Sequence, residues 1–519
     1  MSNKIYPIGI QNFESLRQDD YFYIDKTALI YQMVKTGRYY FLSRPRRFGK
    51  SLLISTLEAY FRGKKELFMG LAIEKLEKDW IKYPILHLDL NIEKYDAPES
   101  LDNILEKSLV AWEKLYGAEP SERSFSLRFA GIIERACEQT GQRVVILVDE
   151  YDKPMLQAIG NEELQKQFRN TLKAFYGVLK TMDGCIKFAL LTGVTKLGKV
   201  SVFSDLNNLD DISMRNQYIE ICGVSEQEIH SNLENEIHEF AAARGVTYDK
   251  LCAELRENYD GYHFTWPSPD IYNPFSLLNA FADGKMDSYW FGSGTPTYLI
   301  EMLNKFDVLP STIGGEEVLP SDFDAPTERM ENATPLLYQS GYVTIKNHDK
   351  ETDLYLLDMP NQEVRIGLKR SLLPNYVERY TQNANTMIAK MSVPIRNGRM
   401  DEALQMLQTF LSTIPQCDNT NYEGHYQQMF YIIFSLLGYY VDVEVRTPRG
   451  RVDIVLRTQT TLYVMELKLD RSAEVAMNQI NLKNYPERFA LCGLPVVKVG
   501  INFDGERKTL KDWKIEETI

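Results

Sequence analysis

The chain has 519 residues, of which 44% are hydrophobic and 25% are charged, and its formal net charge is −13 at pH 7. This length predicts three or four domains with full hydrophobic cores. The acidic balance argues against a protein that coats nucleic acid with a broad basic surface, but not against an enzyme that uses local basic groups and metal ions.

The cysteines indicate a reducing compartment. They are scattered and form no C-x-x-C pair, which favours free thiols over a disulfide framework or a zinc site (Cys137, Cys185, Cys222, Cys252, Cys417 and Cys492). The first residues show no apolar signal region, and no apolar run approaches the length needed to cross a bilayer. We therefore expect a cytoplasmic protein with no membrane partner.

Residues 39–62 predict a phosphate-binding loop. An apolar run at 39–42 is typical of a buried strand, a basic loop follows, and Gly49-Lys50-Ser51 opens a segment with apolar residues at helical spacing. Gly49 would let the backbone approach a phosphate, Lys50 would reach the terminal phosphates, and Ser51 would hold Mg²⁺. The first glycine of the usual pattern is replaced by Arg44, which requires a different loop path.

We expect the nucleotide to contact the whole loop, which comprises Arg44, Arg46, Arg47, Phe48, Gly49, Lys50, Ser51 and Leu52. Upstream, Asp25 could cap a helix or approach the nucleotide, and the residues alone leave both readings open. Downstream, 84–91 predicts a short buried strand, and 99–116 and 124–139 predict helices.

A second run, 144–148, predicts a strand that ends in Asp149-Glu150. A buried parallel strand can deliver Asp149 to Mg²⁺ at its carboxyl end, and Glu150 could polarise the water that attacks the γ-phosphate. A further helix (162–183) and strand (186–191) end at Thr192, which is either a sensor of the γ-phosphate or an ordinary strand terminus. This alternation of strands and helices predicts an α/β fold with a mostly parallel, doubly wound sheet.

These motifs, together with YFYIDKT, YDGYHF, YNPFSLL and GTPTYLI, resemble the bacterial AAA-ATPase-like family. Its members resemble AAA+ and STAND P-loop ATPases and often carry a C-terminal PD-(D/E)XK nuclease-like domain. The resemblance implies ATP and Mg²⁺ as ligands, a P-loop core at 1–222 and a helical lid at 223–309. It also implies that the chain could assemble into a homo-oligomer. Residues 304–307 match the guanine-reading motif N-K-x-D, but they end an apparent helix, so we expect adenine.

Residues 310–395 predict a connector. The stretch 310–334 is polar and rich in Gly and Pro, and 336–365 predicts a helix and a hairpin that turns at 347–350. A winged-helix-like surface and a plain spacer are equally compatible with this pattern.

The last part, 396–519, predicts helices at 397–415 and 422–440 and an αβββαβ order. Its strands are expected at 441–447, 450–458, 461–470 and, as the last strand, 495–503, with a helix at 471–485.

This part also holds a second acidic cluster. Asp453 lies within an apolar strand, while Glu466 and Lys468 share one face of the next strand. Buried charges of this kind make sense around a divalent cation, Mg²⁺ or Mn²⁺, with Glu423 completing the acidic shell and Gln479 orienting the site. The arrangement resembles the PD-(D/E)XK nuclease core, although the proline of that motif is absent.

We therefore expect a nucleotide-regulated, metal-dependent nuclease that acts on nucleic acid, with DNA as the expected partner, in mobile-element control or defence. One alternative is an ATP-switched binding or scaffold protein with a silent nuclease fold. Another is a protein in which Arg44, Arg46 and Arg47 hold the nucleotide so tightly that it is structural.

Overall fold

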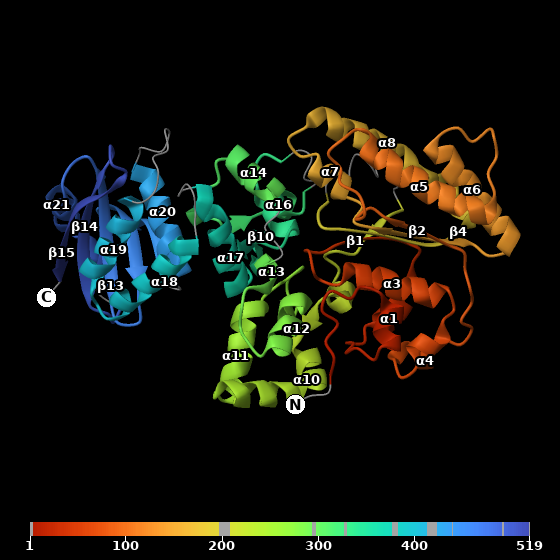
Figure 1. Cartoon of the computed structure of the whole chain (residues 1–519), viewed down its shortest axis with the longest axis horizontal. Coiled ribbons are helices and arrows are strands. Elements are labelled where there is room, and N and C mark those ends of the chain that lie inside the picture. The colour runs from red at the N-terminus through yellow and green to blue at the C-terminus, as the bar shows by residue number, and fades with distance from the viewer. Residues whose placement is uncertain are drawn as a thin grey trace. The chain divides into compact units, whose positions relative to one another are not determined.

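The computed structural model describes residues 4–196, 208–292, 297–325, 330–375, 382–412, 423–437, 440–489 and 492–517. The chain forms two compact units (Figure 1). The N-terminal unit comprises Met1–Phe306 and Gly315–Val364, and the C-terminal unit comprises Asp307–Gly314 and Arg365–Ile519. Within these described ranges, no helix is both long and apolar enough to cross a membrane.

The N-terminal unit is built on a five-stranded parallel sheet with the order β2-β3-β4-β1-β5. Its strands are β1 (Tyr39–Ser43), β2 (Ile85–Asp89), β3 (Val144–Asp149), β4 (Ile186–Gly193) and β5 (Asp210–Asp211). The interior strands are continuous apolar runs because helices cover both faces of the sheet, α5, α6 and α8 on one side and α3 on the other (Figure 1). The predicted parallel α/β core is confirmed.

The long helices of this core follow the predicted ranges closely, and the short helices α1, α4 and α7 were not predicted. The helices are α1 (Phe13–Gln18), α2 (Thr27–Thr36), α3 (Lys50–Phe61), α4 (Ala72–Leu76), α5 (Glu99–Tyr116), α6 (Phe125–Thr140), α7 (Lys153–Gln157) and α8 (Glu162–Thr181). Aromatic rings fill the space between α6 and α8, where Phe129 and Phe175 stack with their centroids 4.3 Å apart.

The region predicted as a lid is helical. It contains α10 (Glu226–Arg244), α11 (Tyr248–Tyr259), α12 (Pro274–Asp283), α13 (Tyr289–Gly292) and α14 (Thr297–Lys305), with the short pair β6 (Val224–Ser225) and β7 (Ile271–Tyr272). Ser225 and Glu228 form a capping box that starts α10.

The predicted connector, 310–395, is divided between the two units. Its first half carries α15 (Pro320–Phe323), α16 (Thr334–Gln339) and an antiparallel sheet of β8 (Glu316–Val318), β10 (Leu354–Asp358) and β9 (Thr344–Asp349). The hairpin turns at 350–353, three residues later than predicted, because β9 stays paired as far as Asp349 and Asp353 adopts a positive φ of 57°. Helix α17 (Gln362–Leu372) begins in one unit and ends in the other.

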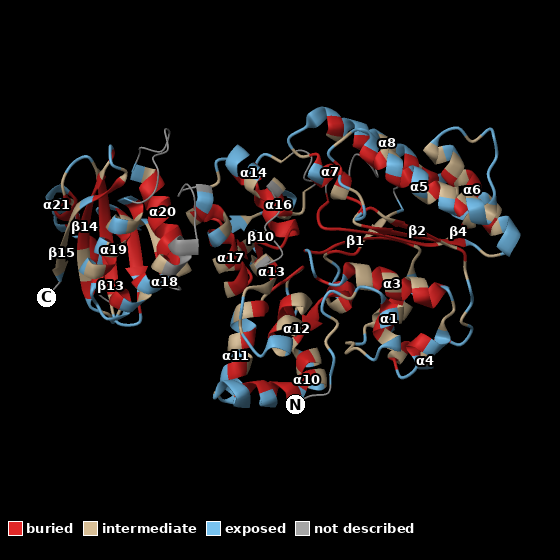
Figure 2. Ribbon diagram, in the orientation of Figure 1, coloured by how far each residue is buried: buried red, intermediate tan, exposed pale blue. Residues whose placement is uncertain are grey.

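The C-terminal unit packs α19 (Met400–Ser412), α20 (Glu423–Leu436) and α21 (Ala473–Lys483) against one sheet, and α18 (Gln382–Arg396) packs against α19. The strand order is that of the sequence: β11 (Tyr440–Thr447), β12 (Gly450–Arg457), β13 (Leu462–Leu469), β14 (Val496–Asp504) and β15 (Thr509–Glu517). The predicted αβββαβ order is present, but β14 is not the last strand, because β15 pairs with it along the edge. The middle strands are buried (Figure 2).

Candidate nucleotide and nuclease sites

The loop between β1 and α3 has the geometry of a phosphate cradle. Arg47 and Gly49 both adopt left-handed backbone conformations, with φ of 67° and 93°, so the chain curls before α3 begins at Lys50. The Lys50 ammonium folds back over the loop and donates to the carbonyl oxygens of Arg44, at 3.0 Å, and Pro45, at 3.1 Å. The start of α3 therefore presents its amides and this ammonium to one space.

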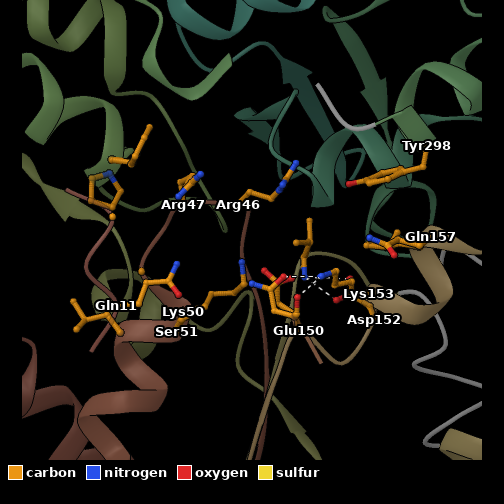
Figure 3. A pocket seen from close by; sticks show the side chains of 18 of the residues that line it. Gln11, Arg46, Arg47, Lys50, Ser51, Glu150, Asp152, Lys153, Gln157 and Tyr298 are labelled. Atoms are coloured by element: carbon orange, nitrogen blue, oxygen red, sulfur yellow. Dashed lines mark hydrogen bonds between the residues drawn. The ribbon is translucent and has the colours of Figure 1, made fainter. Parts of the chain in front are cut away.

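That space is a cavity of about 700 Å³, within the range of small-molecule sites. In Figure 3, Arg46, Arg47, Lys50 and Glu150 face it from opposite sides. Its lining is charged near α3 and β3, and it also includes an apolar group that comprises Pro7, Ile8, Ile10, Pro274, Phe275 and Leu278. A ligand with a polyanionic end and a flat apolar end matches this distribution.

Two loop residues lie elsewhere than expected. Arg44 is 1% exposed, and its guanidinium donates to the carbonyl oxygens of Ser43 and Ser213 while lying 4.0 Å from the centre of the Phe264 ring. Burial lowers the pKa of Arg44 to about 10. Phe48 is also buried and packs edge-on against Phe264. Neither Arg44 nor Phe48 lines the cavity, and both pack beneath the loop. Their predicted contacts with the nucleotide are therefore corrected to a structural role.

The carboxyl ends of β3 and β4 meet beside the loop. Thr192 is buried and donates to Asp149, with 2.6 Å between Oγ1 and Oδ1. Thr192 thus orients Asp149. Neither of these two residues lines the cavity, whereas Glu150 does. Glu150 has a φ of 53°, an unusual conformation for a residue with a side chain, and strain of this kind gathers at functional sites.

Asp152 and Lys153 extend the cavity wall. Sequence reasoning missed both residues, and only their position after Asp149-Glu150 could have pointed to them. Asp152 is 1% exposed and accepts hydrogen bonds from the Thr195 amide, at 2.6 Å, and its hydroxyl, at 2.8 Å. Burial raises the pKa of Asp152 to about 6. Lys153 Nζ donates to Asn91 Oδ1 at 2.8 Å.

Other lining residues come from motifs to which sequence reasoning gave no role. Phe275, in YNPFSLL, lies on α12 and lies beneath the Arg47 guanidinium at 4.7 Å from the ring centre. Tyr298, in GTPTYLI, lies on α14 and lines the cavity opposite Lys50 (Figure 3). Asp25 is not among the lining residues. It accepts hydrogen bonds from the Thr27 and Ala72 amides at 2.8 and 2.7 Å, at the starts of α2 and α4. Of the two roles left open for Asp25, helix capping and nucleotide contact, the structure therefore favours capping.

A second site lies where β12 and β13 separate. The antiparallel pairing of these strands runs from Arg457 and Leu462 as far as Ile454 and Met465. Beyond this pair, the Asp453 side chain takes the place of a backbone acceptor between the two strands: its Oδ2 accepts a hydrogen bond from the Leu467 amide at 2.7 Å. The separation brings the side chains of Asp453, Glu466 and Lys468 together, as their spacing predicts.

Glu466 is the most buried member of this group, at 1% exposed. Its Oε1 accepts from Lys468 Nζ at 3.0 Å and from the Gln479 amide, while Oε2 is buried with no hydrogen-bond partner among the described residues. Burial and the neighbouring Asp453 raise the pKa of Glu466 to about 8, and burial raises that of Asp453 to about 6. Burial alone would lower the pKa of Lys468, but Glu466 and Asp453 outweigh it and raise that pKa.

Helix α20 contributes a residue that was not predicted. Glu423 is exposed and accepts from the Leu469 amide at 3.3 Å, and the described residues contain no cluster of three or more His, Cys, Asp or Glu side chains suited to a metal. The place of Glu423 in the acidic shell stays a prediction: after burial, the charge of Glu423 is among the causes that raise the pKa of Asp453 and of Glu466. In addition, Gln427, which sequence reasoning missed, donates to both Asp453 and Glu444 at 3.0 Å.

The residues present fit one divalent cation, because an orphaned, buried carboxylate oxygen of Glu466 lies beside Asp453. The N-terminal unit thus has the fold and loop of a P-loop nucleotide-binding protein, and the C-terminal unit has the sheet and residue pattern of a PD-(D/E)XK domain.

Comparisons with known proteins agree. A family described as predicted AAA-ATPase matches residues 7–203, and the PD-(D/E)XK nuclease superfamily matches residues 421–513. A protein of Azotobacter chroococcum mcd 1, described as an uncharacterized protein in the vnfD 5′ region, is 34% identical over 537 residues, covering 99% of each chain. The chain belongs to this family of predicted AAA-ATPases with a C-terminal PD-(D/E)XK domain.

A solved structure of the ORC2 protein of Aeropyrum pernix, in ADPNP-ADP complexes, is also similar. It covers 72% of this chain and 96% of that chain, with 9% identity and a TM-score of 0.24. With this TM-score and identity, the similarity between the two structures is weak.

Proposed function

We propose that the protein binds and hydrolyses ATP in its N-terminal unit and cleaves nucleic acid, with DNA as the favoured substrate, in its C-terminal unit. ATP binding or hydrolysis would regulate the cleavage. A role in mobile-element control or defence is consistent with this pairing of activities.

In the N-terminal unit, the loop from Arg46 to Ser51 would bind the triphosphate and the apolar end of the cavity would hold the base. A bound Mg²⁺ would neutralise charge on the phosphates. Lys50 would move from the loop carbonyls to the terminal phosphates, Ser51 and Asp149 would hold the ion, and Glu150 would orient the attacking water. Thr192 would keep Asp149 in place through their hydrogen bond.

In the C-terminal unit, Asp453 and Glu466 would hold the divalent cation. Bound there, the cation would supply Lewis acidity and a water of lowered pKa. Lys468 would position that water or stabilise the charge that develops on the phosphate, and Gln479 would hold Glu466 in its orientation. The buried Glu466 oxygen without a partner is the observation that carries this half of the proposal, because a buried, unpartnered carboxylate oxygen is costly without a cation.

A cleavage assay with and without ATP tests the proposal. Plasmid and single-stranded DNA would be incubated with Mg²⁺ or Mn²⁺ and the wild type, Lys468→Ala, Asp453→Asn or Lys50→Ala, with ATP turnover measured in parallel. We expect Lys468→Ala and Asp453→Asn to abolish cutting and keep ATP turnover within about twofold, and Lys50→Ala to lose turnover. Cutting that persists in Lys468→Ala would refute the nuclease assignment.

A second candidate function is nucleic-acid binding without cleavage, switched by ATP. It is favoured by the formal net charge of −13 and by the fact that both Asp453 oxygens already accept hydrogen bonds, from Gln427 and Leu467. Wild-type protein that binds DNA but leaves it intact with either cation would support this alternative. Stoichiometric nucleotide binding without turnover would support a structural nucleotide.

A further inference from the structure

The hairpin of β11 and β12 concentrates positive charge in an acidic chain. Arg446 lies near the end of β11, Arg449 lies in the two-residue turn, and Arg451 lies at the start of β12. All three are exposed. We call these three residues the arginine tip. The stem of a fourth cation, Lys483, lies within 4 Å of the position that a side chain on Gly450 would occupy.

The arginine tip contributes little to the free energy of unfolding. Arg446 and Arg451 are directly opposed across the two strands, and like charges in that position destabilise a sheet. Arg451 meets Glu444 at 3.3 Å and Arg449 meets Glu487 at 3.7 Å, but these side chains are about half exposed, so the ion pairs contribute little. An external anion would relieve the remaining repulsion.

The tip also lies next to the candidate nuclease site. Arg451 contacts Glu444 at 3.3 Å, and Gln427 of α20 donates to both Glu444 and Asp453 at 3.0 Å. Two residues along a strand separate Arg451 from Asp453, a step of about 7 Å.

We propose that the arginine tip binds the sugar–phosphate backbone of the nucleic-acid strand that enters the site of Asp453, Glu466 and Lys468. Guanidinium groups match phosphate oxygens with two parallel hydrogen bonds, and contacts of this kind position a strand without reading its sequence. This inference rests on the proposed function of the C-terminal unit and adds the surface that holds the substrate.

A binding experiment with charge-matched variants tests the inference. The full-length protein would be titrated into labelled duplex and single-stranded DNA in EDTA, so that no cleavage occurs, at several salt concentrations. Arg446→Ala/Arg451→Ala is compared with Arg457→Ala/Arg507→Ala, which also removes two exposed arginines of this unit. We expect the tip variant to bind about tenfold or more weakly and to lower the salt slope by about 2, and the control to match the wild type.

The melting temperature separates a binding defect from unfolding. The tip variant should melt at or above the temperature of the wild type, because it removes an opposed pair of like charges. Arg446→Lys/Arg451→Lys should recover part of the affinity, since it restores charge without the planar fork. If the tip variant and its control lost the same DNA affinity, or if neither lost any, the inference about the arginine tip would be overturned while the proposed function stood. A wild type that does not bind DNA would overturn the proposed function as well.

Discussion

A buried carboxylate supports the phosphate loop from a distance. Glu363 is 3% exposed and accepts from the Trp290 amide at 2.7 Å, while the indole of Trp290 donates to the Arg46 carbonyl at 3.1 Å. Burial raises the pKa of Glu363 to about 7. A carboxylate with a raised pKa is favoured in its protonated form by the folded state, so its ionisation costs stability.

We therefore predict a pH-dependent effect of Glu363→Gln. The stabilising contribution of protonated Glu363 is fully present below pH 4.5 and is lost as the pH rises through 7. The amide keeps an acceptor for Trp290 and cannot ionise. The variant should match the wild type near pH 5 and exceed it at pH 8 by up to about 3 kcal/mol, measured by chemical unfolding of the N-terminal unit.

Glu317→Gln, at an exposed position of β8, is the matched control and should leave the difference between the two pH values unchanged. If Glu363→Gln and the wild type followed parallel curves from pH 5 to pH 8, the buried carboxylate would not be the source of the pH dependence.

Single residues also mark the limit of sequence reasoning. Glu466 and Lys468 were predictable because two-residue spacing places strand side chains on one face, and Asp453 because it is a charge within an apolar strand. Gln427 and Glu444 were not, because their part in the site depends on how α20 packs across β11 and β12. Arg44 was expected at the phosphates from its place in a basic loop, and only the packing of Phe264 and Ser213 around it explains its burial.

Among the elements, α21 depends on one glycine for its approach to the sheet. A side chain at Gly500 of β14 would place its Cβ 2.6 Å from the Ala473 carbonyl oxygen and 2.8 Å from the Met477 amide nitrogen. Both atoms belong to the backbone of α21, so the helix itself would have to move. Helix α21 carries Gln479, and its displacement would alter the orientation of Glu466.

Gly500→Ala should therefore destabilise the C-terminal unit by about 1–3 kcal/mol and weaken the proposed cleavage activity. Gly177→Ala in α8 is the control, because no atom lies within 4 Å of the added Cβ and alanine favours a helix. The two melting curves and the cleavage rates provide the measurement, and unchanged stability in Gly500→Ala would contradict the tight contact.

Strong local patterns made most elements predictable. The interior strands are continuous apolar runs, and the long helices begin or end within a few residues of the predicted bounds. Strand β5 has two acidic residues and β15 alternates charged residues with few apolar ones, so neither has the hydrophobic signal of a strand. Both are held by pairing with a neighbour at the sheet edge, which single-sequence patterns do not report.

At the scale of the whole molecule, the chain passes between its two units more than once. Residues 307–314 belong to the C-terminal unit, where the Ser311 amide donates to Gln428 at 3.1 Å, whereas 315–364 complete the N-terminal unit. The four consecutive domains expected from the sequence stay a prediction, because patterns along the chain do not reveal which distant segments pack together.

We predict that nucleotide stabilises one unit selectively. Calorimetry of the full chain should show two transitions, and ATP with Mg²⁺ at 100 times the dissociation constant should stabilise the N-terminal one by about 2.7 kcal/mol. Lys50→Ala should abolish this shift and leave the other transition unchanged. An equal shift of both transitions would mean that the nucleotide acts on the units together.

The hydrogen bond from the Leu467 amide to Asp453 has a practical consequence for anyone who wants an inert protein to trap with substrate. Alanine at 453 would remove the carboxylate and leave the Leu467 amide without its acceptor where β12 and β13 separate, so a loss of the proposed activity could reflect a damaged sheet. Asp453→Asn keeps an acceptor for the Leu467 amide and removes the charge. It is therefore the better variant for co-crystals with an uncut substrate.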